Sequence, residues 1–98
     1  MLDKMKQLMD MQRKMQEMKR ELENTNFDVE SSCGSIKITM NGSQEVKSVI
    51  VNRDPRELDK INLEKAIKDA YNRAIKRSHD VAAEKMKKIT GMNIPGLF

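Results

Sequence analysis

Bulky aromatic side chains are nearly absent from this chain. It contains no tryptophan, and two phenylalanines and one tyrosine are its only aromatic residues among 98. A core built from Met, Ile, Val and Leu in so small a chain is thin. We therefore expect a single domain, residues 1–98, that associates with a second copy of itself to bury the apolar surface that one copy leaves exposed.

Residues that bind metals or carry redox chemistry are also scarce. Cys33 is the only cysteine and His79 the only histidine, so the chain has no His/Cys cluster for a zinc site and no internal disulfide. The sequence offers no clear activating base for Cys33, which we interpret as a thiol in a turn. We expect no metal and no cofactor.

Two further patterns argue against an enzyme. The four glycines form no phosphate-binding loop. Ser78-His79-Asp80 has the composition of a catalytic triad, but consecutive residues of a helix point about 100° apart and cannot form a hydrogen-bonded relay. We expect no catalysis and no small-molecule substrate.

Long apolar runs are missing as well. No stretch approaches the ~18 residues of a membrane span, and Lys4, Lys6 and Asp10 interrupt the apolar core that a signal peptide would need. The lone cysteine is typical of a reducing compartment. These features predict a cytoplasmic protein with no membrane partner.

Methionine, by contrast, is abundant, and six of the nine methionines lie in the first 18 residues. Apolar residues recur there every three or four positions, and no Gly or Pro interrupts residues 1–24, which predicts a long helix with one apolar side. The stripe consists of Met5, Leu8, Met11, Met15, Met18 and Leu22. At roughly 36 Å the helix is long enough to project beyond its domain. The stripe is expected to pack on the sheet or on a second copy, or else to bind varied partners.

The pattern then changes from helical to alternating. Residues 27–30, 36–40 and 46–51 are predicted strands, in which Val49 and Val51 share one face with the stem of Lys47. Residues 31–34 form the first turn. Asn41-Gly42 is predicted to form the second, because both residues tolerate positive φ. The result is a three-stranded antiparallel sheet.

A second long helix is predicted to end the fold. After a short helical turn over residues 56–61, Asn62 is expected to cap a helix that runs to about Lys88. Its predicted buried face consists of Leu63, Ile67, Ala70, Ala74, Val81 and Ala82, widened by Tyr71, Ile75 and Met86. Thr90-Gly91 and Pro95-Gly96 end regular structure. The predicted fold is α+β, in the order α-β-β-β-α with long terminal helices.

Positive charge is concentrated in the second half of the chain. The net charge is +4, and residues 56–98 contain ten basic and six acidic side chains. Such an excess favours an anionic partner, nucleic acid or membrane surface. From charge alone, a solvated lysine-rich helix face is an equally good interpretation. The aromatics are too few for stacking on single strands, and no recognition-helix motif is present.

Several stretches are similar to the YbaB/EbfC family of bacterial nucleoid-associated proteins. They are MDMQRKMQ at residues 9–16, IKITMNG at 36–42, EVKSV at 45–49, DAYNRA at 69–74, and a carboxyl-terminal segment that ends in PGLF. Two features depart from the family pattern. Residues 31–34 retain one glycine where the family turn is glycine-rich, and the Asp-Pro motif after the third strand is shifted to residues 54–55.

The resemblance implies a tweezer-shaped homodimer that binds double-stranded DNA with little sequence demand. The implied role is nucleoid organisation or gene expression in the bacterial cytoplasm. In this family, contact with DNA is attributed to the projecting helices. The resemblance therefore implies that the DNA-binding residues of this chain are Arg13, Lys14, Lys19, Arg20, Arg73, Lys76 and Arg77. The alternative is a protein-interaction adaptor whose methionine-rich helices grip a partner. A peripheral membrane protein is disfavoured, because a dimer would bury the same apolar face.

Overall fold

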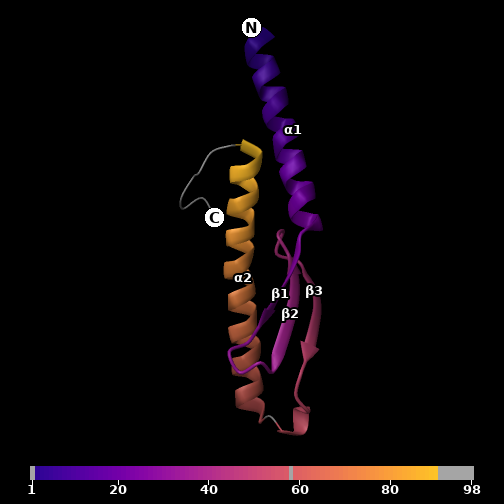
Figure 1. Cartoon of the computed structure of the whole chain (residues 1–98), viewed down its shortest axis with the longest axis vertical. Helices are drawn as coiled ribbons and strands as arrows, with labels where there is room; N and C mark the ends of the chain where they lie inside the picture. The colour runs from indigo at the N-terminus through magenta and orange to yellow at the C-terminus, as the bar shows by residue number, and fades with distance from the viewer. Residues whose placement is uncertain (1, 58, 91–98) are drawn as a thin grey trace.

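The computed structural model describes residues 2–57 and 59–90, which form an elongated molecule of 66 × 22 × 17 Å (Figure 1). The predicted α+β fold and its α-β-β-β-α order are confirmed. The predicted irregular tail, residues 91–98, lies outside the described residues. The elements are α1 (Leu2–Asn24), β1 (Asn26–Glu30), β2 (Ile36–Asn41), β3 (Val46–Val51), a 3-10 turn η1 (Pro55–Glu57) and α2 (Lys60–Thr90).

The core lies between α2 and the central strand of the sheet. β2 pairs antiparallel with β1 on one side and with β3 on the other. Its buried residues Ile36, Ile38 and Met40 pack against three alanines of α2, Ala66, Ala70 and Ala74. Because alanine is small, α2 approaches the sheet closely, and the core is as thin as the composition predicts.

The apolar face of β3 continues this core but is not covered. Val49 pairs with Ile38 and Val51 with Ile36, and paired residues of adjacent strands point to the same face of a sheet. The predicted common face of Val49 and Val51 is therefore confirmed. α2 packs mainly on β1 and β2, so both valines remain about half-exposed.

A register shift interrupts the alternation at the start of β3. It falls between Thr39 and Met40 and places Val46, rather than Lys47, opposite Met40. The strict alternation that was predicted to place Lys47 on the same face as Val49 is therefore interrupted by a bulge. Val46 joins the apolar face of the strand instead.

The carboxylate of Asp59 caps α2. Its Oδ1 accepts a hydrogen bond from the Asn62 N–H at 2.7 Å, and its Oδ2 accepts one from Asn62 Nδ2 at 3.1 Å. The prediction that Asn62 is the cap was wrong, because Asp59 reaches the N–H of the third helical residue, as an N-cap does. α2 consequently begins at Lys60, and the preceding helical turn is shortened to η1.

The buried side of α2 is narrower than predicted. Ala70, Ala74, Val81 and Ala82 are buried, and Leu63, Ile75 and Met86 are partly buried, as expected. Ile67 and Tyr71 were predicted to be buried as well, but both are nearly half-exposed. They lie on the flank of a helix that only part of the sheet covers.

The turn between β2 and β3 differs from its prediction. Neither Asn41 nor Gly42 has a positive φ, and Gln44 adopts the left-handed conformation instead, with φ 66°. Gly42 is needed for close approach to α1. Its N–H donates to the Leu22 carbonyl at 2.9 Å and to the Thr25 carbonyl at 3.0 Å. A Cβ at this position would lie 2.8 Å from Leu22 Cδ2 and 3.1 Å from Leu22 O.

The buried side chain of Asn41 completes the junction with α1. Its Nδ2 donates to the Glu23 carbonyl at 3.2 Å and to Glu45 Oε1 at 2.9 Å. Its Oδ1 accepts from the N–H groups of Ser43 and Glu45. Every polar atom of this buried amide is thus paired, and the last turn of α1 is attached to the β2–β3 turn.

α1 runs antiparallel to α2 (Figure 1). It projects beyond the end of α2, as predicted. No described residue of α1 is buried. Glu21 and Leu22 are partly covered near α2, where Glu21 Oε2 forms an ion pair with Lys85 Nζ at 3.2 Å. Most of the methionine stripe is exposed, so a single subunit does not supply the surface on which it was expected to pack.

Replacing Gly42 by alanine tests the junction. Gly42→Ala is expected to lower the free energy of unfolding by about 1–2 kcal/mol, because the added methyl group must displace Leu22. Urea denaturation followed by circular dichroism measures this change. The control is Ser43→Ala, at the neighbouring exposed residue. It is expected to change the free energy of unfolding by less than about 0.5 kcal/mol. Equal stabilities of the two variants would contradict the role of close approach.

Candidate nucleic-acid interface

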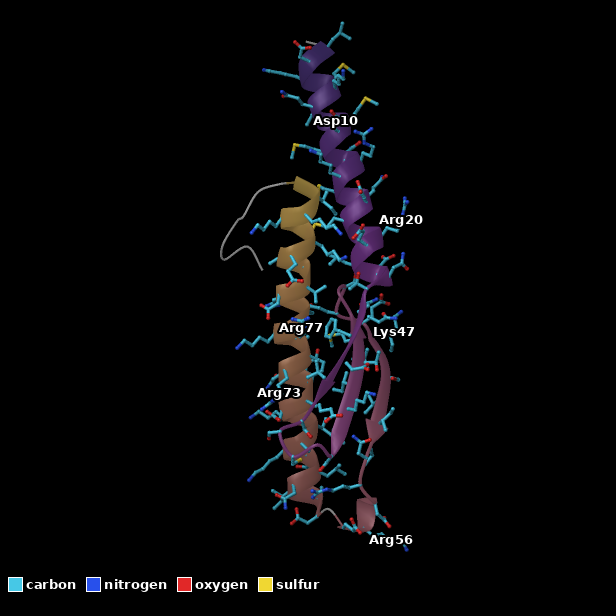
Figure 2. The ribbon with its side chains drawn as sticks, in the orientation of Figure 1. Asp10, Arg20, Lys47, Arg56, Arg73 and Arg77 are labelled. Atoms are coloured by element: carbon cyan, nitrogen blue, oxygen red, sulfur yellow. The ribbon has the colours of Figure 1, made fainter. Side chains whose placement is uncertain are left out.

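The four basic residues predicted on α1 do not share one face. Arg13 and Arg20 are seven residues, or two turns, apart and lie on the same side, whereas Lys14 and Lys19 point elsewhere. Arg20 is two positions from Leu22 and points roughly 200° away from it around the helix. Arg20 therefore lies on the side of α1 that faces away from α2 (Figure 2).

Acidic neighbours reduce the charge of α1. Arg13 Nη2 lies 3.2 Å from Asp10 Oδ1, and both side chains are exposed. An exposed pair of this kind contributes little to stability. It nevertheless offsets one of the predicted cations, and α1 carries nearly as many acidic as basic residues.

The three basic residues predicted on α2 do form a group. Arg73, Lys76 and Arg77 are exposed. Lys76 and Arg77 follow Arg73 by three and four residues, which makes both of them its neighbours on the surface of the helix. Figure 2 labels Arg73 and Arg77 on α2. Arg73 Nε lies 3.1 Å from Asp69 Oδ2. In the described part of the chain, Lys76 and Arg77 take part in no ion pair.

Asp69 fixes the position of this group relative to the sheet. Its Oδ2 accepts the Ser32 N–H at 2.7 Å, from the turn between β1 and β2. The Ser32 N–H and the Arg73 guanidinium together lower the pKa of the Asp69 carboxyl. The carboxylate thus remains charged, ties α2 to the sheet and orients Arg73.

Arg13 and Arg20 of α1 face away from Arg73 of α2. Ala82 lines a small cavity together with Leu22, on the side of α2 that meets α1. Arg73 is nine residues, or two and a half turns, from Ala82, and therefore points to the opposite side. These three arginines do not meet in the space between α1 and α2 of one subunit.

Two lysines that were not predicted as site residues extend the α2 group. Lys65 and Lys87 are each eleven residues from Lys76, a spacing of three turns plus about 20° that aligns the three side chains over roughly 33 Å. Asp69, Asp80 and Glu84 lie within the same arc of the helix and offset part of their charge. We call this surface the outer face of α2; it comprises Lys65, Arg73, Lys76, Arg77 and Lys87. The eleven-residue spacing is the signal by which the sequence could have identified the two lysines.

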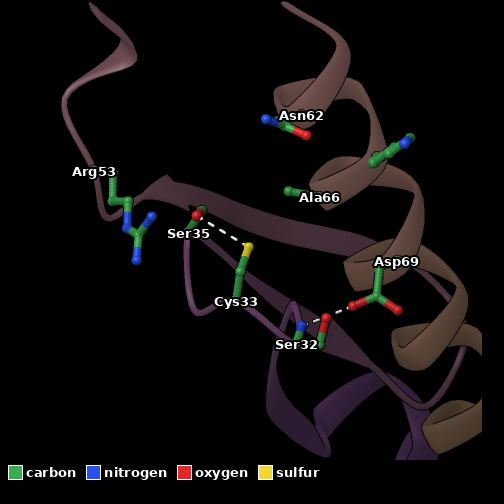
Figure 3. Close-up of a pocket in the computed structure, with 8 residues that line it drawn as sticks. Ser32, Cys33, Ser35, Arg53, Asn62, Ala66 and Asp69 are labelled. Carbon is green, nitrogen blue, oxygen red and sulfur yellow. Dashed lines mark hydrogen bonds between the residues drawn. The ribbon is translucent and has the colours of Figure 1, made fainter. Parts of the chain in front are cut away.

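A separate cavity of about 460 Å³ lies at the amino-terminal end of α2 (Figure 3). It is lined by Ser32, Cys33, Ser35, Arg53, Asn62, Lys65, Ala66 and Asp69. Cys33 lies in the β1–β2 turn, as predicted, and is exposed. Its Sγ is 3.4 Å from Ser31 Oγ and 3.1 Å from Ser35 Oγ. These hydroxyl groups lower the pKa of the thiol to about 7, a shift that the sequence did not predict.

The described residues do not assemble a catalytic centre around the nucleophiles. His79 lines the other cavity, beside Leu22 and Gly42, and not the one that contains Cys33. The hydroxyl of Ser78 is buried, donates to the Ile75 carbonyl at 2.6 Å and accepts from Gln44 Nε2 at 3.1 Å. Ser78 thus connects α2 to the β2–β3 turn and has a structural role.

Comparison with known proteins identifies the family. The model of the YbaB/EbfC DNA-binding family matches residues 1–93. The chain belongs to this family. It is also 35% identical to a nucleoid-associated protein of Clostridium kluyveri and 35% identical to one of Clostridium novyi. Each alignment covers 96% of this chain and 84% of the relative.

A solved structure is similar in part. The crystal structure of an uncharacterized protein from Helicobacter pylori is 19% identical, with a TM-score of 0.48, and the match covers 76% of this chain and 93% of that one. In the present chain, no helix among the described residues is long and apolar enough to cross a membrane.

The Cys33 thiol is expected to titrate close to neutral pH. Because the hydroxyls of Ser31 and Ser35 stabilise the thiolate, its alkylation rate should rise with pH through a midpoint at about 7. Iodoacetamide labelling followed by mass spectrometry between pH 5.5 and 10 measures the midpoint. A Ser31→Ala/Ser35→Ala variant should titrate closer to the ordinary value of 9.0. A wild-type midpoint near 9.0 would contradict the hydrogen-bonding role of these serines.

Proposed function

We propose that this protein is a non-enzymatic, nucleoid-associated protein of the bacterial cytoplasm that binds double-stranded DNA with little sequence specificity. Its role would be nucleoid organisation or gene expression. Membership of the YbaB/EbfC DNA-binding family supports DNA as the partner. The observation that carries the proposal is the outer face of α2, where exposed cations are aligned along a 31-residue helix.

The chemistry of this face suits the phosphate backbone. Lysine and arginine side chains in a row neutralise successive phosphates and release counterions, which gives affinity without reading bases. Tyr71 is exposed but lies on another side of α2, and the chain offers little aromatic surface for stacking on single strands. Duplex DNA bound through its backbone is the partner that these residues fit.

Arg13, Lys14, Lys19 and Arg20 of α1 supply a second, weaker contact in this proposal. Arg13 and Arg20 point outward from the subunit, and the acidic residues beside them reduce their attraction for phosphate. Because Arg13 and Arg20 of α1 face away from Arg73 of α2, these arginines of one subunit do not bind a duplex between its own two helices. Simultaneous contact by both groups requires a second subunit or a bent duplex.

A homodimer of single-domain subunits supplies that second subunit. The apolar face of β3, formed by Val46, Val49 and Val51, continues the core beyond α2 and is exposed in one chain. Ile67 and Tyr71 are exposed on the flank of α2. We propose that a second copy covers the β3 face, because monomers rarely expose apolar patches contiguous with their core.

The exposed methionine stripe favours a second candidate function. A protein-interaction adaptor would use this flexible apolar surface to bind a partner helix, with the basic residues serving only solubility. Capture of a partner that survives nuclease treatment and high salt would support the adaptor, whereas capture that requires nucleic acid would support DNA binding.

Reversing the charge of the α2 group tests the DNA-binding surface. The variant Arg73→Glu/Lys76→Glu/Arg77→Glu is expected to weaken binding to duplex DNA and to reduce the slope of log affinity against log salt by about three, one per phosphate contact. Fluorescence anisotropy over a salt series measures both quantities, and sedimentation velocity checks that the oligomeric state is unchanged.

A matched variant controls for net charge. Arg53→Glu/Arg56→Glu/Lys60→Glu makes the same charge change near the amino-terminal end of α2, away from the tested group, and should leave most of the slope intact. Equal losses in the two variants would show that net charge, and not the α2 group, determines binding. An unchanged affinity in the Arg73→Glu/Lys76→Glu/Arg77→Glu variant would indicate that DNA binds to α1 instead.

The two faces of β3 provide an internal test of the dimer. Val49 and Ile50 are adjacent and similarly exposed, at 55% and 46%, but point to opposite faces of the sheet. Val49→Lys should shift a dimer toward monomer, because a lysine charge would be buried in the proposed interface. Ile50→Lys should not. Light scattering after gel filtration measures the mass; dissociation by Ile50→Lys alone would contradict the proposed interface.

A further inference from the structure

Four methionines of α1 are unusually accessible. Met5, Met9, Met11 and Met15 are between 61% and 69% exposed, although methionine is an apolar residue that normally fills cores. Met40, in the centre of the sheet, is 0% exposed. The same chain thus presents the same thioether chemistry in two opposite environments.

The amino-terminal half of α1 makes little tertiary contact within the subunit. It projects beyond α2, and no described residue of α1 is buried (Figure 1). A helix without tertiary packing is marginal in water and depends on the helix propensity of its own residues. Methionine is a good helix former, whereas its sulfoxide is polar and chiral. Oxidation therefore changes the side chains on which the order of this half of the helix depends.

We propose that the projecting half of α1 is a site of reversible oxidative modification by peroxides, at Met5, Met9, Met11 and Met15. The thioether sulfur attacks one peroxide oxygen, so that an S–O bond forms and the O–O bond breaks. The sulfur loses two electrons. The departing hydroxide takes up the proton of the oxygen that is now bound to sulfur, so one hydrogen peroxide yields one sulfoxide and one water. Methionine sulfoxide reductases reduce the sulfoxide back to methionine.

The expected consequence is weaker DNA binding, and this step rests on the proposed function. Met9 lies four residues before Arg13 and on the same side of α1, and Met11 lies three residues before Lys14. A sulfoxide oxygen accepts hydrogen bonds from these cations in place of a phosphate. Oxidation also replaces good helix formers by polar, chiral side chains in a segment that lacks tertiary packing.

Peroxide treatment of two variants tests the proposal. Both carry Cys33→Ser, so that the thiol does not react, and one also carries Met5→Leu/Met9→Leu/Met11→Leu/Met15→Leu. Leucine preserves the apolar helix-forming surface but does not oxidise. Peptide mass spectrometry measures oxidation at each methionine against time, with Met40 as the buried reference. Anisotropy measures the affinity for one duplex before oxidation, after it, and after reductase treatment.

We expect the four methionines to oxidise before Met40 and the affinity of the Cys33→Ser protein to fall about tenfold, with recovery after reduction. The leucine variant should bind equally well before and after peroxide. Oxidation no faster than at Met40, or an affinity that peroxide leaves unchanged or lowers equally in both proteins, would overturn the inference. Failure of the unoxidised protein to bind DNA would instead refute the proposed function itself.

Discussion

The direction in which α1 projects depends on its attachment to the turn between β2 and β3. A helix ends with carbonyl groups that lack partners within the helix, and here Gly42 and Asn41 donate hydrogen bonds to the carbonyls of Leu22 and Glu23. Since no described residue of α1 is buried, these bonds and the Glu21–Lys85 ion pair supply much of its placement. The positions of the basic residues and methionines on α1 follow from this junction.

The thin core explains why so much apolar surface remains available. Three alanines let α2 lie close to β2, and close approach takes the place of the large aromatic side chains that the chain lacks. A single helix cannot cover three strands, however, so the inner face of β3 stays open. The scarcity of aromatic residues thus favours association, since the surface of a second copy is the simplest one that completes such a core. The outer face of α2 then remains free for an anionic partner.

Hydrophobic periodicity was sufficient to predict the fold but not its contacts. The alternation in residues 27–51 and the helical stripes on either side predicted the order of elements, because each pattern reflects a local geometry. Asp59 replaced Asn62 as the cap because capping depends on the path of the preceding turn. Gly42 was predicted to adopt a turn conformation, whereas its role is close contact with Leu22 of α1. The two residues are distant in sequence, so local patterns did not reveal their contact. Likewise, residue type identified Arg73, Lys76 and Arg77 as candidates, but only the packing of α1 on α2 showed that Arg13 and Arg20 face away from Arg73.

The proposed function depends on contact between this protein and the phosphate backbone of duplex DNA. The most direct test is the affinity of the wild-type protein for two duplexes of unrelated sequence, measured by fluorescence anisotropy across a series of salt concentrations. Backbone contact predicts that the two duplexes bind with similar affinities, and that both affinities fall steeply and in parallel as salt increases. Strong preference for one duplex, or no binding at low salt, would contradict it.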